Sequence, residues 1–220
     1  MAELRLVANK GWQAMDWRSG LRNYPQSTLR LRSMLLAAIL TFGSISSNSA
    51  AAYEVLGWDW KYQANPIETH FVICENDAPA GASKRIKEAA AKWNYAKLKF
   101  VFDDDDCPAN PPLNYVEFGE LKNPSKTAEA DTPNIPATTK MKRCKVRFNK
   151  DKFWYLGNAD PGADENDLFS VALHEFGHCL GLDHVKTKGV VMQEQLDSGK
   201  YLRELAADDL AGRNKIYGAP

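Results

Sequence analysis

Five residues in the C-terminal half of the chain have the types and spacing of a metal site. They are His174, Glu175, His178, Gly181 and His184. On a helix, His174 and His178 lie one turn apart on the same face, so both imidazoles can bind one ion. Glu175 is rotated by about 100° from His174. Its carboxylate is therefore placed to act on a water molecule beside the ion rather than to serve as a third ligand.

Gly181 and His184 complete the pattern. Glycine readily takes the left-handed conformation that ends a helix, so the chain can turn there and bring His184 to the ion from another side. Three neutral imidazoles leave the fourth tetrahedral position open, which is typical of a catalytic zinc site. Two alternatives are an exposed helix that merely carries histidines and a zinc site without catalysis. The presence of Glu175 argues against the second.

The segment reads H-E-x-x-H-x-x-G-x-x-H and resembles the metzincin clan of zinc metalloendopeptidases. Metzincins carry a methionine in a tight turn below the zinc, and Met192 in Gly189-Val-Val-Met192 fits that position. Within the clan the chain is most similar to the matrixins, in particular compact bacterial-type ones, over about 144–218. This resemblance implies an α+β domain. It would have a twisted, mostly parallel sheet with two main helices above a small C-terminal subdomain that ends in a closing helix.

The resemblance also implies a function. The three histidines would hold one Zn²⁺, Glu175 would be the general base, and the substrate would be an extended polypeptide. Two rival functions are a secreted zinc-containing binding protein without turnover and a small-molecule metallohydrolase. The chain departs from the usual matrixin pattern at Val185, where serine is usual, and at Gln193-Glu194, where Tyr-Pro is usual. His70 is the one histidine outside the motif, and we expect it to be a strand residue with no metal role.

The elements that must position these residues can be read from hydrophobic periodicity and capping residues. Asp167 is a good N-cap for the helix that carries His174. The closing helix is expected to have Ala207, Leu210 and Tyr217 on one face. The pattern predicts strands at 67–74, 98–102, 113–118 and 144–149, helices at 81–97 and about 206–217, a loop at 119–134, and a short edge strand at 135–140. A substrate would add to that edge strand near Pro136–Thr139.

Residues 1–52 have the order of a secretory signal: basic residues, an apolar run at 34–42, and small residues ending in Ala50-Ala51-Ala52. We therefore expect cleavage after Ala52, secretion, and a catalytic domain at 53–220. An uncleaved membrane anchor is the alternative, although the apolar run is short for a span.

The chain has 28 basic and 28 acidic residues, of which six basic and two acidic lie in 1–52, so the remainder has a net charge of −4. That charge gives no support for binding to nucleic acid or to an anionic membrane. We expect a monomer without stable membrane insertion.

All four cysteines lie after residue 52, and an even number in an exported domain suggests two disulfides. Three pairings are possible. In the topology that the resemblance implies, Cys74 would pair with Cys107 and Cys144 with Cys179. A buried free thiol at Cys179 is the alternative.

Two acidic segments, Asp103–Asp106 and 158–167, could bind Ca²⁺, but neither has an EF-hand spacing. Calcium is therefore a possibility without assigned residues.

Overall fold

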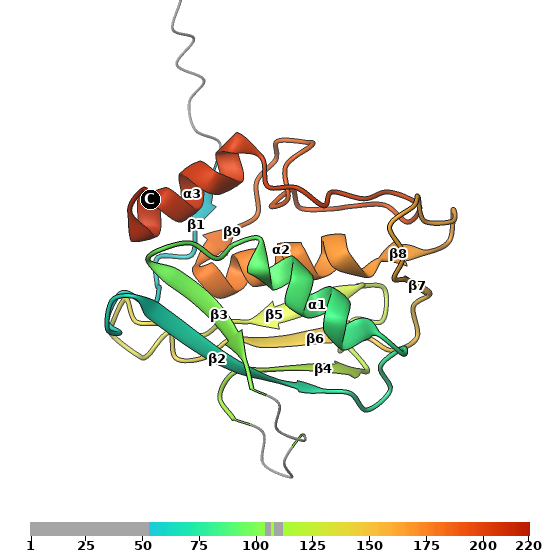
Figure 1. Ribbon diagram of the computed structural model, residues 1–220, viewed down its shortest axis with the longest axis horizontal. Helices are drawn as coiled ribbons and strands as arrows, with labels where there is room; N and C mark the ends of the chain where they lie inside the picture. Colours follow the sequence, from blue (N-terminus) through green and yellow to red (C-terminus); the bar gives the residue numbers. More distant parts are fainter. Residues whose placement is uncertain (1–52, 104–106, 108–111) are drawn as a thin grey trace, which may run out of the picture. The chain divides into compact units, whose positions relative to one another are not determined.

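A five-stranded sheet covered by helices on one face forms the core of the protein (Figure 1). The computed structural model describes residues 53–103, 107 and 112–220. The strand order is β3 (Leu98–Phe102), β2 (Ile67–Cys74), β4 (Tyr115–Gly119), β6 (Lys145–Asn149) and β5 (Ala128–Asp131). The first four strands are parallel to one another, and β5 is antiparallel to β6 at the edge. The predicted α+β domain with a mostly parallel sheet is confirmed.

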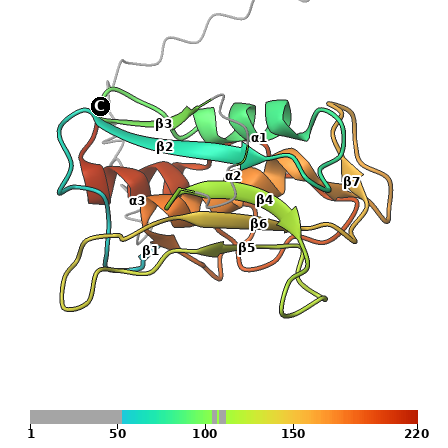
Figure 2. The same ribbon diagram turned by 90° about the horizontal axis from the view of Figure 1, so that it is seen from below.

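The helices α1 (Ala82–Ala91) and α2 (Leu168–Leu180) lie side by side on the same face of the sheet, as Figures 1 and 2 show. Buried residues alternate with exposed ones at the start of β2, so its inner face can pack against the two helices. The Phe176 ring of α2 contacts the rings of Phe71 and Phe100, with centroids 5.3 and 5.0 Å apart. The indole of Trp93 donates to the Leu173 carbonyl at 2.8 Å. These contacts fix α2 over the sheet.

Helix α1 is shorter than the predicted span of 81–97. It ends at Ala91, and the side chain of Asn94 then forms hydrogen bonds with strand β3. The Asn94 carboxamide oxygen accepts from the Phe100 amide at 2.8 Å. Asparagine competes with helix formation in this way because its short side chain can replace a backbone partner. The chain therefore turns directly into β3.

The edge of the sheet also differs from the prediction. The sequence pattern predicts a loop at 119–134, but this segment contains the edge strand β5. The expected strand at 135–140 is a turn, closed by hydrogen bonds of Thr138 to the Ile135 carbonyl. Strand β5 was missed because its sequence, Ala-Glu-Ala-Asp, has low strand propensity and is ordered by pairing with β6. An extended peptide adding to this edge would meet β5, not Pro136–Thr139.

Four short strands and a closing helix complete the domain. β1 (Glu54–Val55) pairs with β9 (Leu182–Asp183), and β7 (Trp154–Tyr155) pairs with β8 (Asn166–Asp167). The closing helix α3 (Ala207–Tyr217) lies close to its predicted span. Its buried face differs from the predicted one, because Tyr217 is buried but Ala207 is exposed and Leu210 is half-buried. The residues that α3 buries are Asp209, Gly212, Arg213 and Tyr217.

Both disulfides have the predicted pairing. Cys74 at the end of β2 is bonded to Cys107, and Cys144 before β6 is bonded to Cys179 in α2. Among the described residues, no helix has the length and apolar character needed to cross a membrane. The predicted signal segment at 1–52 lies outside the described residues, so it remains a prediction.

Candidate metal centre

Helix α2 positions two of the three predicted ligands. It begins at the predicted N-cap: the Asp167 carboxylate accepts from the Ser170 amide at 2.9 Å. His174 and His178 follow one turn apart on the half-buried side of the helix. The disulfide from Cys179 ties the same helix to the sheet. These contacts hold the two imidazoles on a rigid element.

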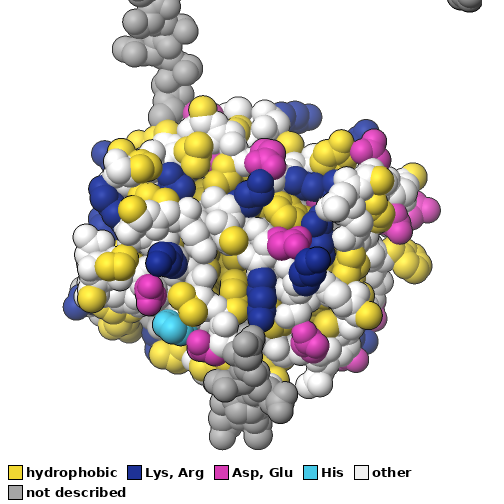
Figure 3. All heavy atoms as spheres, viewed as in Figure 1, with side chains coloured by type: hydrophobic (Ala, Val, Ile, Leu, Met, Phe, Trp, Pro, Cys, Tyr) yellow, Lys and Arg dark blue, Asp and Glu magenta, His cyan; other side chains and the backbone are white. Residues whose placement is uncertain are grey.

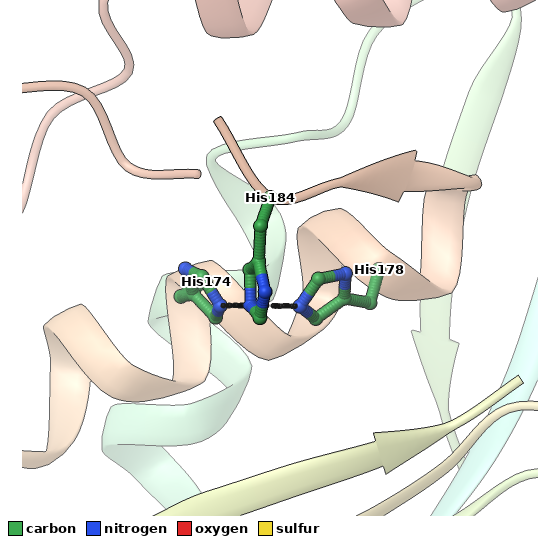
Figure 4. A group of neighbouring side chains, drawn as sticks. All are labelled: His174, His178 and His184. Atoms are coloured by element: carbon green, nitrogen blue, oxygen red, sulfur yellow. Dashed lines mark hydrogen bonds between the residues drawn. The ribbon is translucent and has the colours of Figure 1, made fainter. Parts of the chain in front are cut away.

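Gly181 ends α2 as predicted. Its φ is +100°, and its amide donates to the His178 carbonyl at 2.9 Å. A Cβ added at Gly181 would lie 2.6 Å from the Trp58 carbonyl oxygen. A side chain is therefore disfavoured both by the backbone conformation and by the neighbouring backbone. The chain then reverses through β9 and returns His184 toward α2 (Figure 4).

The three histidines converge on one point. Their Nε2 atoms lie 3.1 Å from one another (Figure 4). Nδ1 of His174 is 2.7 Å from the Val191 carbonyl, and Nδ1 of His178 is 2.8 Å from the Leu182 carbonyl. A carbonyl oxygen can only accept, so both Nδ1 atoms carry the proton and both Nε2 atoms present lone pairs.

This arrangement fits a zinc ion. Facing lone pairs repel one another unless a cation lies between them, so the short contacts between Nε2 atoms are not ordinary hydrogen bonds. Tetrahedral zinc with bonds of about 2.0–2.1 Å requires nitrogens about 3.3 Å apart, close to the separation seen here. The carbonyl partners also orient the rings, as is usual for zinc-bound histidines.

Burial sets the protonation of these groups. It lowers the pKa of His174 to about 3 and that of His178 to about 4, so both rings are neutral ligands at pH 7. Burial also raises the pKa of the Glu175 carboxyl to about 8. The positive charge of Lys126 acts in the opposite direction on Glu175, with a smaller effect. Glu175 is thus a carboxyl group in an apolar surrounding, next to the point where the histidines meet.

Met192 lies under α2, as the sequence indicated. It is buried, and a Cβ added at Gly177 would lie 2.2 Å from its sulfur atom. The Val185 amide donates to the Met192 carbonyl at 2.9 Å, which closes the turn below the histidines. A soft thioether packed against a glycine of the metal-binding helix forms the floor of the site.

Asp209 is a site residue that sequence reasoning missed. Its buried carboxylate accepts from the amides of Val191 and Met192 at 3.0 and 3.1 Å. The Val191 carbonyl in turn accepts from His174. Helix α3 therefore holds the methionine turn, which orients one metal ligand. The only sequence signal was an acidic residue in the first turn of a helix, which ordinarily serves the helix itself.

Arg203 was missed as well. It donates to both carboxylate oxygens of Asp167, at 2.6–3.1 Å, and to the carbonyls of Asn158 and Ala159. The Asp167 side chain is fully buried. The neighbouring Leu202 amide donates to the Ser170 hydroxyl at 2.8 Å. The segment that approaches α3 is thereby attached to the start of α2.

The histidines and Glu175 line an open cleft of about 730 Å³. One side of the cleft is formed by β5 and the residues before it, and the other by 191, 193–196 and Leu202. Strand β5 has no further strand on its outer side among the described residues, so its backbone is available to a peptide.

On the face drawn in Figure 3, basic and acidic side chains are interspersed, without a large basic surface.

The other predicted sites stay apart from this cleft. His70 is exposed on β2, and its Nδ1 lies 2.9 Å from a carboxylate oxygen of Asp103. In the part of the chain that the structure describes, the histidine triad is the one cluster of metal-binding side chains. In 158–167, Asp167 is paired with Arg203 and Glu165 accepts from the Gly162 amide. Residues 104–106 lie outside the described residues, so calcium binding stays an unassigned prediction.

Comparisons with known proteins agree with this geometry. The sequence model of the matrixin family matches residues 72–218. The chain is 43% identical over 78 residues to matrix metalloproteinase-16 of Homo sapiens, which is 34% of this chain and 12% of that protein. It is 45% identical over 75 residues to matrilysin of Mus musculus, covering 33% and 26%. It is 36% identical over 79 residues to metalloendoproteinase 5-MMP of Arabidopsis thaliana, covering 33% and 22%. The matched segment thus spans about a tenth to a quarter of the length of these relatives.

Proposed function

Because this chain belongs to the matrixin family, we propose that it is a zinc-dependent endopeptidase that hydrolyses peptide bonds in extended polypeptides. One observation carries the proposal. Three neutral imidazoles converge beside the buried carboxyl of Glu175, in a cleft whose rim is a free sheet edge. A binding site without turnover has no need of Glu175, and a small-molecule hydrolase has no need of the open edge.

His174, His178 and His184 would hold the zinc ion, which when bound polarises the scissile carbonyl and activates water as the nucleophile. With a zinc ion beside it, the Glu175 carboxyl would ionise below its zinc-free pKa, and its carboxylate would accept a proton from that water as the water oxygen bonds to the carbonyl carbon. It then returns the proton to the leaving nitrogen as the carbon–nitrogen bond breaks. The products are a carboxylate and an amine, and no acyl-enzyme forms.

Strand β5 would bind the peptide backbone. An added strand pairs its amides and carbonyls with a free edge, and this holds the scissile bond in an extended form along the cleft. Recognition through the backbone positions a peptide without demanding a particular sequence, so selectivity is left to side chains that line the cleft.

The test of the proposal compares wild type with Glu175→Gln on an unfolded protein substrate. The variant keeps the size of the side chain but removes the base. We expect zinc content to be retained and cleavage to fall by about 100-fold or more. Cleavage by the wild type should also stop when a chelator removes zinc and return when zinc is restored.

Glu120→Gln is the matched control, because it makes the same chemical change at an exposed residue outside the cleft. It should cleave as wild type does. Equal cleavage by wild type and Glu175→Gln would exclude Glu175 as the base. Zinc binding by a wild type that cleaves nothing would favour the binding protein.

We also propose that the chain acts as a secreted monomer of the compact bacterial type. Two disulfides and the signal-like segment 1–52 support secretion. The compact bacterial type is supported by the histidine count: animal matrixins hold a second, structural zinc with several histidines, and here His70 alone remains outside the motif.

A further inference from the structure

Lys126 stands out because of its place on the rim of the cleft. It lies two residues before Ala128, in a segment that continues the pairing of β5 with β6, since the Asn149 amide donates to the Thr127 carbonyl at 2.9 Å. Ala128 and Ala130 of β5 pack against the core. Lys126 lies just before this strand and lines the cleft together with Thr127 and Glu129.

The backbone of Lys126 is held on both sides while its side chain has no partner. The buried carboxamide of Asn149 donates to the carbonyls of Lys126 and Pro124, at 2.9 and 3.1 Å. The Lys126 amide donates to the Asn123 carbonyl at 3.1 Å. The residue is exposed, and none of the described carboxylates forms an ion pair with its ammonium group. The structure thus presents an unpaired cationic side chain on a backbone segment that hydrogen bonds hold in place.

Lys126 lines the same cleft as the three histidines and Glu175. Among the described residues, Lys126 is the one lysine or arginine that lines the cleft. A negatively charged side chain on a bound peptide that lies away from the histidines would therefore meet this basic side chain and no other in the cleft lining.

The direction of a bound peptide follows from the ends of β5. The carbonyl of Thr132, after β5, accepts from the Trp58 indole, and the Trp58 carbonyl lies beside Gly181 at the end of α2. The opposite end of β5, near Lys126, lies toward the start of α2. The Asn149 side chain binds the Lys126 carbonyl, and the Asn149 carbonyl accepts from the indole of Trp154 in β7. Strand β7 pairs with β8, which directly precedes α2. A peptide that adds antiparallel to β5, the more stable pairing, therefore passes the histidines before it reaches Lys126.

We propose that Lys126 is a specificity-determining residue that binds a substrate carboxylate side chain on the C-terminal side of the scissile bond. The substrate class is then a polypeptide with aspartate or glutamate shortly after the cleaved bond. This inference rests on the proposed endopeptidase function. An ion pair between exposed partners changes a binding constant by about two- to fivefold, which sets the expected preference.

The test measures kcat/KM for a neutral parent peptide and for versions that carry glutamate or lysine at each position after the scissile bond. Wild type should prefer glutamate over the neutral residue at one of these positions by about two- to fivefold. Lys126→Met, which keeps most of the apolar stem, should lose this preference, measured as the ratio of kcat/KM for the glutamate and neutral peptides, so that any change in the basal rate cancels. Lys126→Glu should prefer lysine at the same position, and Lys126→Arg should retain the wild-type preference.

Lys122→Glu is the matched control, since it makes the same charge change at an exposed lysine of the same loop outside the cleft. The preference should weaken at high salt, because salt screens exposed charges.

An unchanged preference in Lys126→Met and Lys126→Glu, with the neutral parent still cleaved, would overturn the role of Lys126 alone. A wild type that cleaves none of the peptides would overturn the proposed function, and this inference with it. A preference only for peptides that end at that position would instead assign Lys126 to the terminal carboxylate.

Discussion

At the scale of single residues, the site depends on groups that tolerate no close substitute. Two histidines need a carbonyl partner to hold the ring proton on Nδ1, and those partners come from Val191 and Leu182. The motif specified the ligands, the base and the turn, because fixed spacing on a helix defines their directions. The ring partners and Asp209 were not predictable, because their contacts depend on how distant segments fold together.

Gly181→Ala should be among the most damaging small substitutions. Alanine at a φ of +100° costs about 1–2 kcal/mol, and its Cβ would also displace the Trp58 carbonyl from 2.6 Å. We expect a loss of about 2 kcal/mol or more in the free energy of unfolding, measured with urea. Zinc affinity should fall too, because the turn sets the position of His184.

Gly57→Ala provides the control for that prediction. Its φ is +87°, but nothing lies within 4 Å of the added Cβ, so only the backbone cost remains. Equal losses in the two variants would show that the contact with Trp58 contributes nothing.

At the scale of elements, sequence pattern predicted best where packing and local signals agree. Strand β2 and helix α2 have apolar faces of the right period, and α2 has a capping residue at each end. Strand β5 has only two alanines on its inner face and a low strand propensity, so the sequence pattern misplaced the edge on which the substrate proposal depends. The predicted length of α1 was wrong because it too depends on a contact with a distant segment. The side chain of Asn94 bonds to the backbone of β3, and the helix ends before it.

The contact between Arg203 and Asp167 should stabilise α2 and the far side of the cleft together. Arg203→Met would leave the buried Asp167 carboxylate without its cation, so we expect a loss of about 3–5 kcal/mol in the free energy of unfolding. Adding Asp167→Asn should recover part of this loss, because asparagine caps a helix without a buried charge. Urea unfolding of the two single variants and the double variant would measure the coupling. Strict additivity would contradict it.

At the scale of the whole molecule, the proposed secretion assigns separate roles to the described residues and to the segment before them. Residues 53–220 would be the mature enzyme, and 1–52 would direct its export. When the full chain is expressed in an exporting host, we expect the released protein to begin at Tyr53. Mass spectrometry of its N-terminal peptide is the measurement. Retention of 34–42 in a membrane fraction would instead support the uncleaved anchor.

The disulfide between Cys144 and Cys179 has a consequence for an enzyme exposed to its own activity. Residues 159–164, which are exposed except for Pro161, lie between the two cysteines. A single backbone cut there would still leave the helix that carries Glu175 covalently joined to the strand region at β6. Such a nicked molecule cannot lose either piece by diffusion, so self-digestion at this segment would yield a two-chain protein rather than two separate fragments.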